Sequence, residues 1–66
     1  MQGAPVTDRV QVHLSRQQLR QLYNLLRAEI DWGDGLTKEL EALRQELFAK
    51  AKEAGLVFRE GYAYDR

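Results

Sequence analysis

The chain has 66 residues, of which 44% are hydrophobic and 30% charged, with a net charge of zero and no cysteine. This length allows at most one small domain, and the lack of cysteine excludes disulfides and thiolate metal sites as stabilising features. A neutral chain without a membrane-length apolar run has neither the basic footprint typical of nucleic-acid binders nor a membrane span. We therefore expect a cytoplasmic protein with a flexible N-terminus (1–8) and a single small domain (9–66).

The segment 9–14, RVQVHL, alternates between polar and apolar residues. Val10, Val12 and Leu14 fall on one face of an extended chain, and β-branched residues favour such a conformation. The pattern predicts a half-buried strand.

Two amphipathic helices follow. Ser15 and Gln18 have the spacing of a capping box, and leucines with Tyr23 recur at steps of three to four residues, which predicts a helix over about 15–31. DWGDG interrupts the pattern, and leucines then repeat over about 37–54, with Thr37 or Asp34 as the N-cap. Gly55 predicts a Schellman ending.

The tail LVFREGYAYDR carries three aromatic residues and allows two arrangements. As one continuous strand, it would place Leu56, Phe58, Tyr62 and Tyr64 on one face. As a hairpin, it would turn at Glu60-Gly61, with arms near the lower length limit for strands.

A short loop between two long helices makes them antiparallel neighbours. We expect an α+β, mainly helical fold of order β-α-α-β, in which short N- and C-terminal strands pair with each other or across a dimer. These strands would cover the sides of the two leucine stripes that the helices do not bury against each other.

Catalytic and metal sites are not indicated. His13 is the only histidine and falls on the polar face of the predicted strand, without a partnering nucleophile. DWGDG lacks the oxygen ligands of a calcium loop, since Gly33 and Ala42 occupy positions that need them. We expect no enzymatic activity, no cofactor and no small-molecule substrate.

The residues that could bind a partner are aromatic or basic. Trp32, in a glycine-flanked turn, either closes the end of the helical core, which we favour, or anchors a partner. The tail aromatics could complete this core or another chain's sheet. A basic row on the first helix faces away from the leucines and could contact phosphate or an acidic protein surface. The candidate set is Trp32, Phe58, Tyr62, Tyr64, Arg16, Arg20 and Arg27.

These observations favour a small non-enzymatic interaction or regulatory protein, such as an inhibitor, which binds a protein partner or itself as a homo-oligomer. Residues 8–54 also offer an alternative. The strand, Ser15 and the leucine spacing after it resemble ribbon-helix-helix repressors, although the first helix is long and two aspartates flank the start of the second. This resemblance implies a dimeric DNA-binding regulator with Arg9, Gln11 and His13 as the base-reading residues.

Overall fold

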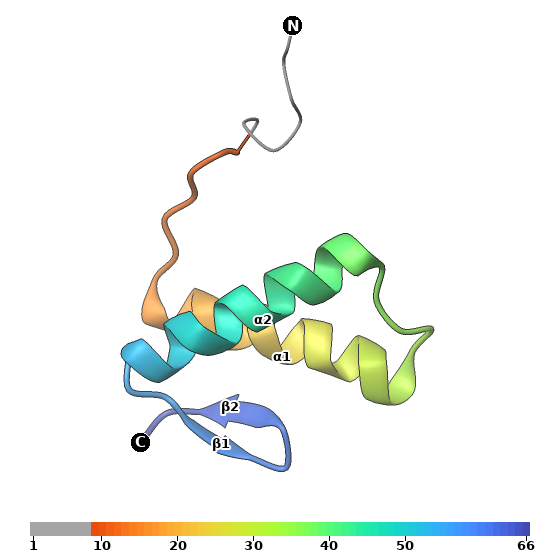
Figure 1. Cartoon of the computed structure of the whole chain (residues 1–66). Coiled ribbons are helices and arrows are strands. Elements are labelled where there is room, and N and C mark those ends of the chain that lie inside the picture. The colour runs from red at the N-terminus through yellow and green to blue at the C-terminus, as the bar shows by residue number, and fades with distance from the viewer. Residues whose placement is uncertain (1–8) are drawn as a thin grey trace, which may run out of the picture.

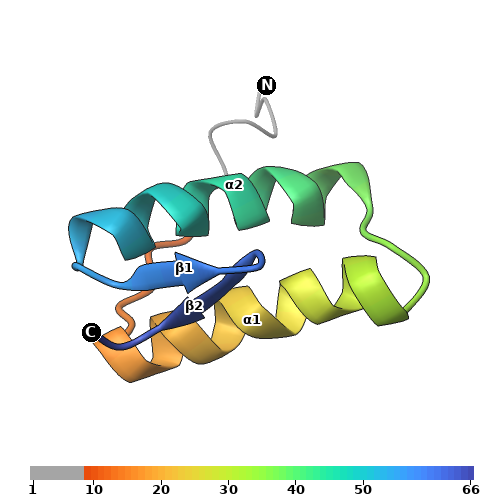
Figure 2. The same cartoon turned by 90° about the horizontal axis from the view of Figure 1, so that it is seen from below.

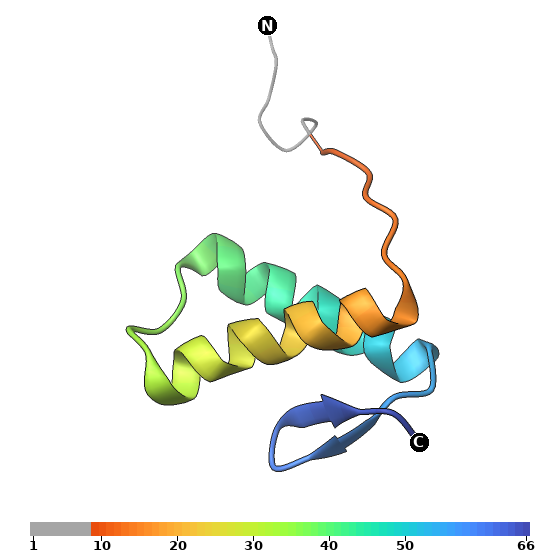
Figure 3. The same ribbon diagram turned by 180° about the vertical axis from the view of Figure 1, so that it is seen from behind.

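The computed structural model describes residues 9–66; the N-terminal residues 1–8, for which flexibility is predicted, lie outside this range. Helix α1 (Arg16–Trp32) and helix α2 (Lys38–Glu53) form an antiparallel pair. Strands β1 (Val57–Arg59) and β2 (Tyr62–Tyr64) follow as an antiparallel hairpin. The hairpin covers one face of the helix pair, whereas residues 9–14 leave the start of α1 toward the opposite face (Figures 1 and 3).

The helix ends are set by local hydrogen bonds. The Ser15 hydroxyl accepts from the Gln18 amide at 3.0 Å, and the Gln18 side chain accepts from the Ser15 amide at 2.9 Å, which confirms the capping box. Thr37, not Asp34, caps α2 by accepting from the Leu40 amide at 3.2 Å. Both helices therefore lie within one residue of the predicted bounds at each end.

The Schellman ending of α2 is also confirmed. The Leu56 amide donates to the Ala51 carbonyl at 3.0 Å, and the Gly55 amide donates to the Lys52 carbonyl at 3.1 Å. Gly55 has a φ of 87°, a left-handed conformation that costs glycine little. This ending turns the chain back beneath the helices, where the hairpin begins (Figure 2).

The core lies between the helix pair and the hairpin. Tyr23 at its centre is 1% exposed, and Ala51 and Ala63 are fully buried. The small alanine side chains allow the helices and the hairpin to approach closely. The buried core residues are Leu19, Tyr23, Leu26, Leu47, Ala51, Leu56 and Ala63.

The predicted strand over residues 9–14 is wrong for the single chain. The segment has no regular secondary structure. Within the described residues, its backbone makes no hydrogen bond to a helix or to the hairpin. Over the described residues the order of elements is α-α-β-β and not the expected β-α-α-β, because the C-terminal segment pairs with itself and not with residues 9–14.

The tail forms the hairpin, so the continuous-strand arrangement with its four-residue face is also wrong. Glu60 and Gly61 have φ values of 53° and 89°, as a two-residue type I′ turn requires, and Arg59 pairs with Tyr62. The turn changes the phase of the side-chain alternation: Phe58 now lies opposite Ala63, and both are directed to the core. Among residues 9–66, no helix has the length and apolar character to cross a bilayer.

Candidate interaction surface

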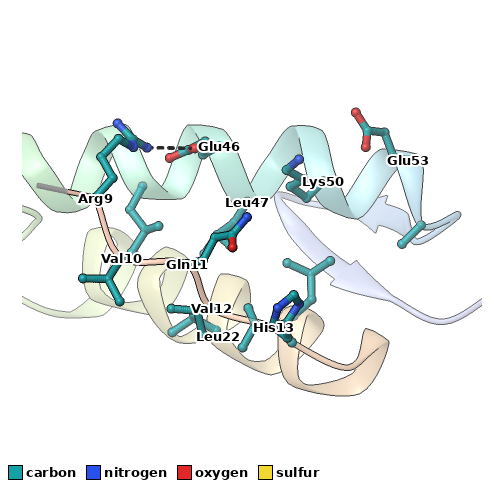
Figure 4. A pocket seen from close by; sticks show the side chains of 14 residues that line it. Arg9, Val10, Gln11, Val12, His13, Leu22, Glu46, Leu47, Lys50 and Glu53 are labelled. Carbon is teal, nitrogen blue, oxygen red and sulfur yellow. Dashed lines mark hydrogen bonds and ion pairs between the residues drawn. The ribbon is translucent and has the colours of Figure 1, made fainter. Parts of the chain in front are cut away.

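The helix-pair face opposite the hairpin carries a long open groove of about 920 Å³ (Figure 4). Its apolar lining includes Leu22, Leu43 and Leu47, and charged side chains of α2 also contribute to it. The segment 9–14 borders it along its whole length. The structure thus brings the N-terminal segment and the leucine stripes together, but without closing the groove. The complete lining is Arg9, Val10, Gln11, Val12, His13, Leu14, Leu19, Leu22, Leu43, Glu46, Leu47, Lys50, Glu53 and Ala54.

The N-terminal segment is held loosely beside this groove. Arg9 pairs with Glu46 on α2 at 3.2 Å, across an exposed surface (Figure 4). Val10 and Val12 remain 86% and 70% exposed, and Leu14 is 41% exposed. An exposed ion pair contributes little free energy, typically about 0–1 kcal/mol. Three apolar side chains and an extended backbone are therefore presented to solvent.

His13 lies on this exposed segment and borders the groove, and it makes no hydrogen bond within the described part of the chain. Residues 9–66 contain no group of three or more histidine, cysteine, aspartate or glutamate side chains arranged to hold a metal ion. The groove thus offers apolar contact and an exposed, extended backbone segment beside it.

On the opposite face, Asn24 holds the hairpin to α1. Its side-chain amide donates to the Ala63 carbonyl at 2.9 Å, and its side-chain oxygen accepts from the Ala63 amide at 2.7 Å. This role of Asn24 is not evident from the sequence, because Asn24 lies beside the leucine stripe of α1 and Ala63 is a small residue 39 positions away. No local pattern connects the two.

An aromatic cluster completes the same face. Tyr23 and Phe58 meet edge to face with ring centroids 5.4 Å apart, and Phe48 lies 4.7 Å from Phe58. Such pairs favour tilted and T-shaped arrangements over face-to-face stacking. Phe58, a candidate partner contact, is therefore used within this chain's own core.

The Tyr23 hydroxyl is satisfied at the edge of the cluster by an arginine. Arg44 donates to it at 3.2 Å and also donates twice to Glu41, at 2.9 and 2.7 Å. The hydrogen bonds from Arg44, and then from Gln45, lower the pKa of Glu41 to about 2. The hydrogen bonds to Glu41 in turn raise the pKa of Arg44.

The basic row of α1 faces the hairpin turn and the C-terminal end of the chain. Arg16 and Arg20 approach Asp65 at 3.6 and 3.7 Å, and Arg27 approaches Asp31 at 3.4 Å. A Cβ added at Gly61 would lie 2.8 Å from the Arg27 guanidinium carbon, so this turn packs directly on the arginine. The three arginines do not form one open basic surface.

Trp32 does not close the end of the core. It is 84% exposed, which makes the favoured interpretation of a core lid wrong. The helix ends beyond it with Gly33 and Gly35 both donating to the Glu29 carbonyl at 3.0 Å, and this tight ending leaves the indole in solvent.

The two tail tyrosines differ in their surroundings. Tyr62 donates to Asp31 at 3.0 Å, and burial followed by this hydrogen bond raises the pKa of its hydroxyl. Tyr64 is 46% exposed, with the Arg59 guanidinium 5.9 Å from its ring centre. The candidate partner contacts are therefore not gathered at one place: Trp32 and Tyr64 are exposed, whereas Phe58 and Tyr62 contact this chain.

Comparison with known proteins finds no match: no family model fits the chain, and no curated protein or solved structure is significantly similar to it. The surface therefore has to be interpreted from its own chemistry.

Proposed function

We propose that the chain is a small non-enzymatic interaction protein that binds through the segment 9–14 and the groove bordering it. The partner contributes an extended, partly apolar segment, from another protein or from a second copy. The exposed valines and free backbone edge of this segment, next to an apolar groove, carry the proposal.

Each part of this surface matches a requirement of strand addition. An incoming strand gains main-chain hydrogen bonds from an extended segment that has none to another described element, and side chains of alternating type provide specificity. The groove can take up apolar side chains from the partner, since Leu22 and Leu43 are only partly buried.

Two double variants of the same segment test this proposal. Val10→Ser/Val12→Ser removes the apolar side chains, and Gln11→Ser/His13→Ser is the matched control on the alternate positions. Association should be measured by sedimentation velocity over a concentration series and by affinity capture from cell extract with the full chain as bait.

We expect the valine variant to weaken whatever association the wild type shows by at least about tenfold, since two valine side chains lose their burial. The control should retain it. Equal association of wild type and valine variant, or no association by wild type in either assay, would contradict the proposal.

DNA binding is the second candidate, and the exposed alternate face of the same segment favours it. The Arg9 side chain is 74% exposed, and Gln11 and His13 are exposed as well. In this function these three side chains would read base edges. Triple alanine substitution of Arg9, Gln11 and His13 should then abolish salt-sensitive binding to genomic DNA fragments, and a wild type without such binding at low salt would exclude it.

A further inference from the structure

We infer that the partner is a second copy of this chain, with the two segments 9–14 paired antiparallel about a two-fold axis that passes between the two Val12 residues. This inference rests on the proposed function and names the occupant of the same surface.

A symmetric dimer requires a surface that matches itself. In an antiparallel pair about a two-fold axis, the residue on the axis meets its own copy, and the residues on either side of it meet each other. With Val12 on the axis, Val10 lies opposite Leu14 of the second copy, and Gln11 lies opposite His13. All three apolar residues of the segment then have apolar neighbours across the pair, as cross-strand stabilisation requires.

Other registers match less well. A shift that places Gln11 on the axis puts Arg9 opposite His13 and leaves Leu14 without an apolar neighbour. A shift that places His13 on the axis brings two histidines together and leaves Val10 unmatched. Registers displaced by one residue put the apolar face of one strand on the polar face of the other. The sequence thus specifies one register.

Charge also favours a second copy. The register with Val12 on the axis places Arg9 opposite Ser15, so no like charges face each other. The net charge of the chain is zero, so two copies approach without overall repulsion.

The groove extends the same contact. The segment and the apolar residues Leu22 and Leu43 border one continuous hollow on the side away from the hairpin. Pairing at residues 9–14 therefore brings the open faces of both helix pairs next to the shared ribbon, where apolar side chains of either copy can enter them.

Cysteine substitution tests the register directly, because the natural chain has no cysteine. Directly opposed residues in an antiparallel pair have Cα atoms about 4.5–5.5 Å apart, within the range that a disulfide bridges. Full-length Val12→Cys should therefore shift to a disulfide-linked species of doubled mass on mild oxidation.

Val10→Cys is the matched control, since its two copies would lie four residues apart along the strand, about 13 Å. It should stay unlinked alone but should link when mixed with Leu14→Cys. Circular dichroism should show the wild-type helix content for each variant, as expected for substitutions at exposed positions.

Sedimentation should give the wild type twice its 7.7 kDa monomer mass at high concentration, and Val12→Asp should raise the dimer dissociation constant at least about tenfold. A monomeric wild type, or Val12→Cys that links no faster than Val10→Cys, would overturn the inference. If the wild type is monomeric but still captures another protein in a valine-dependent way, the proposed function stands and only the dimer is overturned. If the wild type shows neither self-association nor capture, both the dimer and the proposed function are overturned.

Discussion

Asn24 takes the place of a third strand beside the hairpin. Its side-chain amide contacts both the amide and the carbonyl of Ala63, which is the pair of groups that a neighbouring strand would otherwise bond. One side chain of α1 thereby satisfies both outward-facing backbone groups of a hairpin residue.

Asn24→Ala should therefore destabilise the protein. Both Ala63 backbone groups would lose their partner at a buried position, at a cost of about 1–3 kcal/mol in the free energy of unfolding. Urea denaturation measures this change. Gln21→Ala, at an exposed position of the same helix, is the control and should change stability by less than about 0.5 kcal/mol; an equal effect of both would contradict the role of Asn24.

The Glu41–Arg44 pair should make the free energy of unfolding depend on pH in the acidic range. In the folded chain the pKa of Glu41 is about 2, against 4.5 for the ordinary carboxyl. As the pH falls below about 5, the unfolded chain takes up this proton first, so the stabilisation is present above pH 4.5 and is lost as the pH falls through 2.

Comparison with Glu41→Gln isolates this contribution. The difference in unfolding free energy between wild type and Glu41→Gln should be constant from pH 5 to 7 and should shrink between about pH 4.5 and 2. Denaturation curves at a series of pH values measure it. A difference that stays constant down to pH 2 would contradict the assignment.

Among the secondary-structure elements, the β-hairpin has an unusual turn residue. Glu60 has a positive φ of 53°, a conformation that costs most residues free energy and that asparagine tolerates better. The sequence EG is therefore a weaker signal for a type I′ turn than NG, which explains why both arrangements of the tail were open from the sequence.

Glu60→Asn should stabilise the hairpin by about 0.5–1 kcal/mol, since the substitution relieves an unfavourable backbone conformation. Thermal denaturation followed by circular dichroism should show a raised Tm. Glu53→Asn, at an exposed position of α2, is a control for the composition change and should not raise the Tm. A lowered Tm for Glu60→Asn would indicate that the turn is not of this type.

Helix formation, by contrast, is encoded within short stretches. Ser15 and Gln18 fix the start of α1, Thr37 fixes the start of α2, and Gly55 fixes its end, each through hydrogen bonds to residues no more than five positions away. For this reason the helix bounds were predictable to one residue.

At the scale of the whole molecule, the two faces of the helix pair differ in what they contribute to stability. The hairpin face buries Tyr23 and Ala51 almost completely, whereas beside the groove Leu14 is 41% exposed and Val12 is 70% exposed. The stability of the folded chain therefore depends more on the hairpin than on the segment 9–14.

The contribution of each face to stability can be compared with two variants, Phe58→Ala on the hairpin face and Val10→Ser/Val12→Ser beside the groove. Phe58→Ala removes a ring from the aromatic cluster and should cost about 3–5 kcal/mol, a large part of the stability of a domain this small. The double valine variant should change the stability of the monomer by less than about 0.5 kcal/mol. Urea denaturation at low protein concentration measures both, and a reversed order would contradict this division of the surface.

The two helices, the Ser15 cap, the Gly55 ending and the short loop were predictable from the sequence, because they depend on periodicity and on contacts between near neighbours. Both Thr37 and Asp34 remained candidates for the cap of the second helix until the structure showed Thr37. The tertiary structure alone sets the position of the tail. It pairs the tail with itself, turns Phe58 and Ala63 inward, covers Arg27 with the Gly61 turn and leaves Trp32 in solvent. The physical reason is distance along the chain: the Asn24–Ala63 contact joins residues 39 positions apart, and no pattern within a short stretch of sequence signals such a contact.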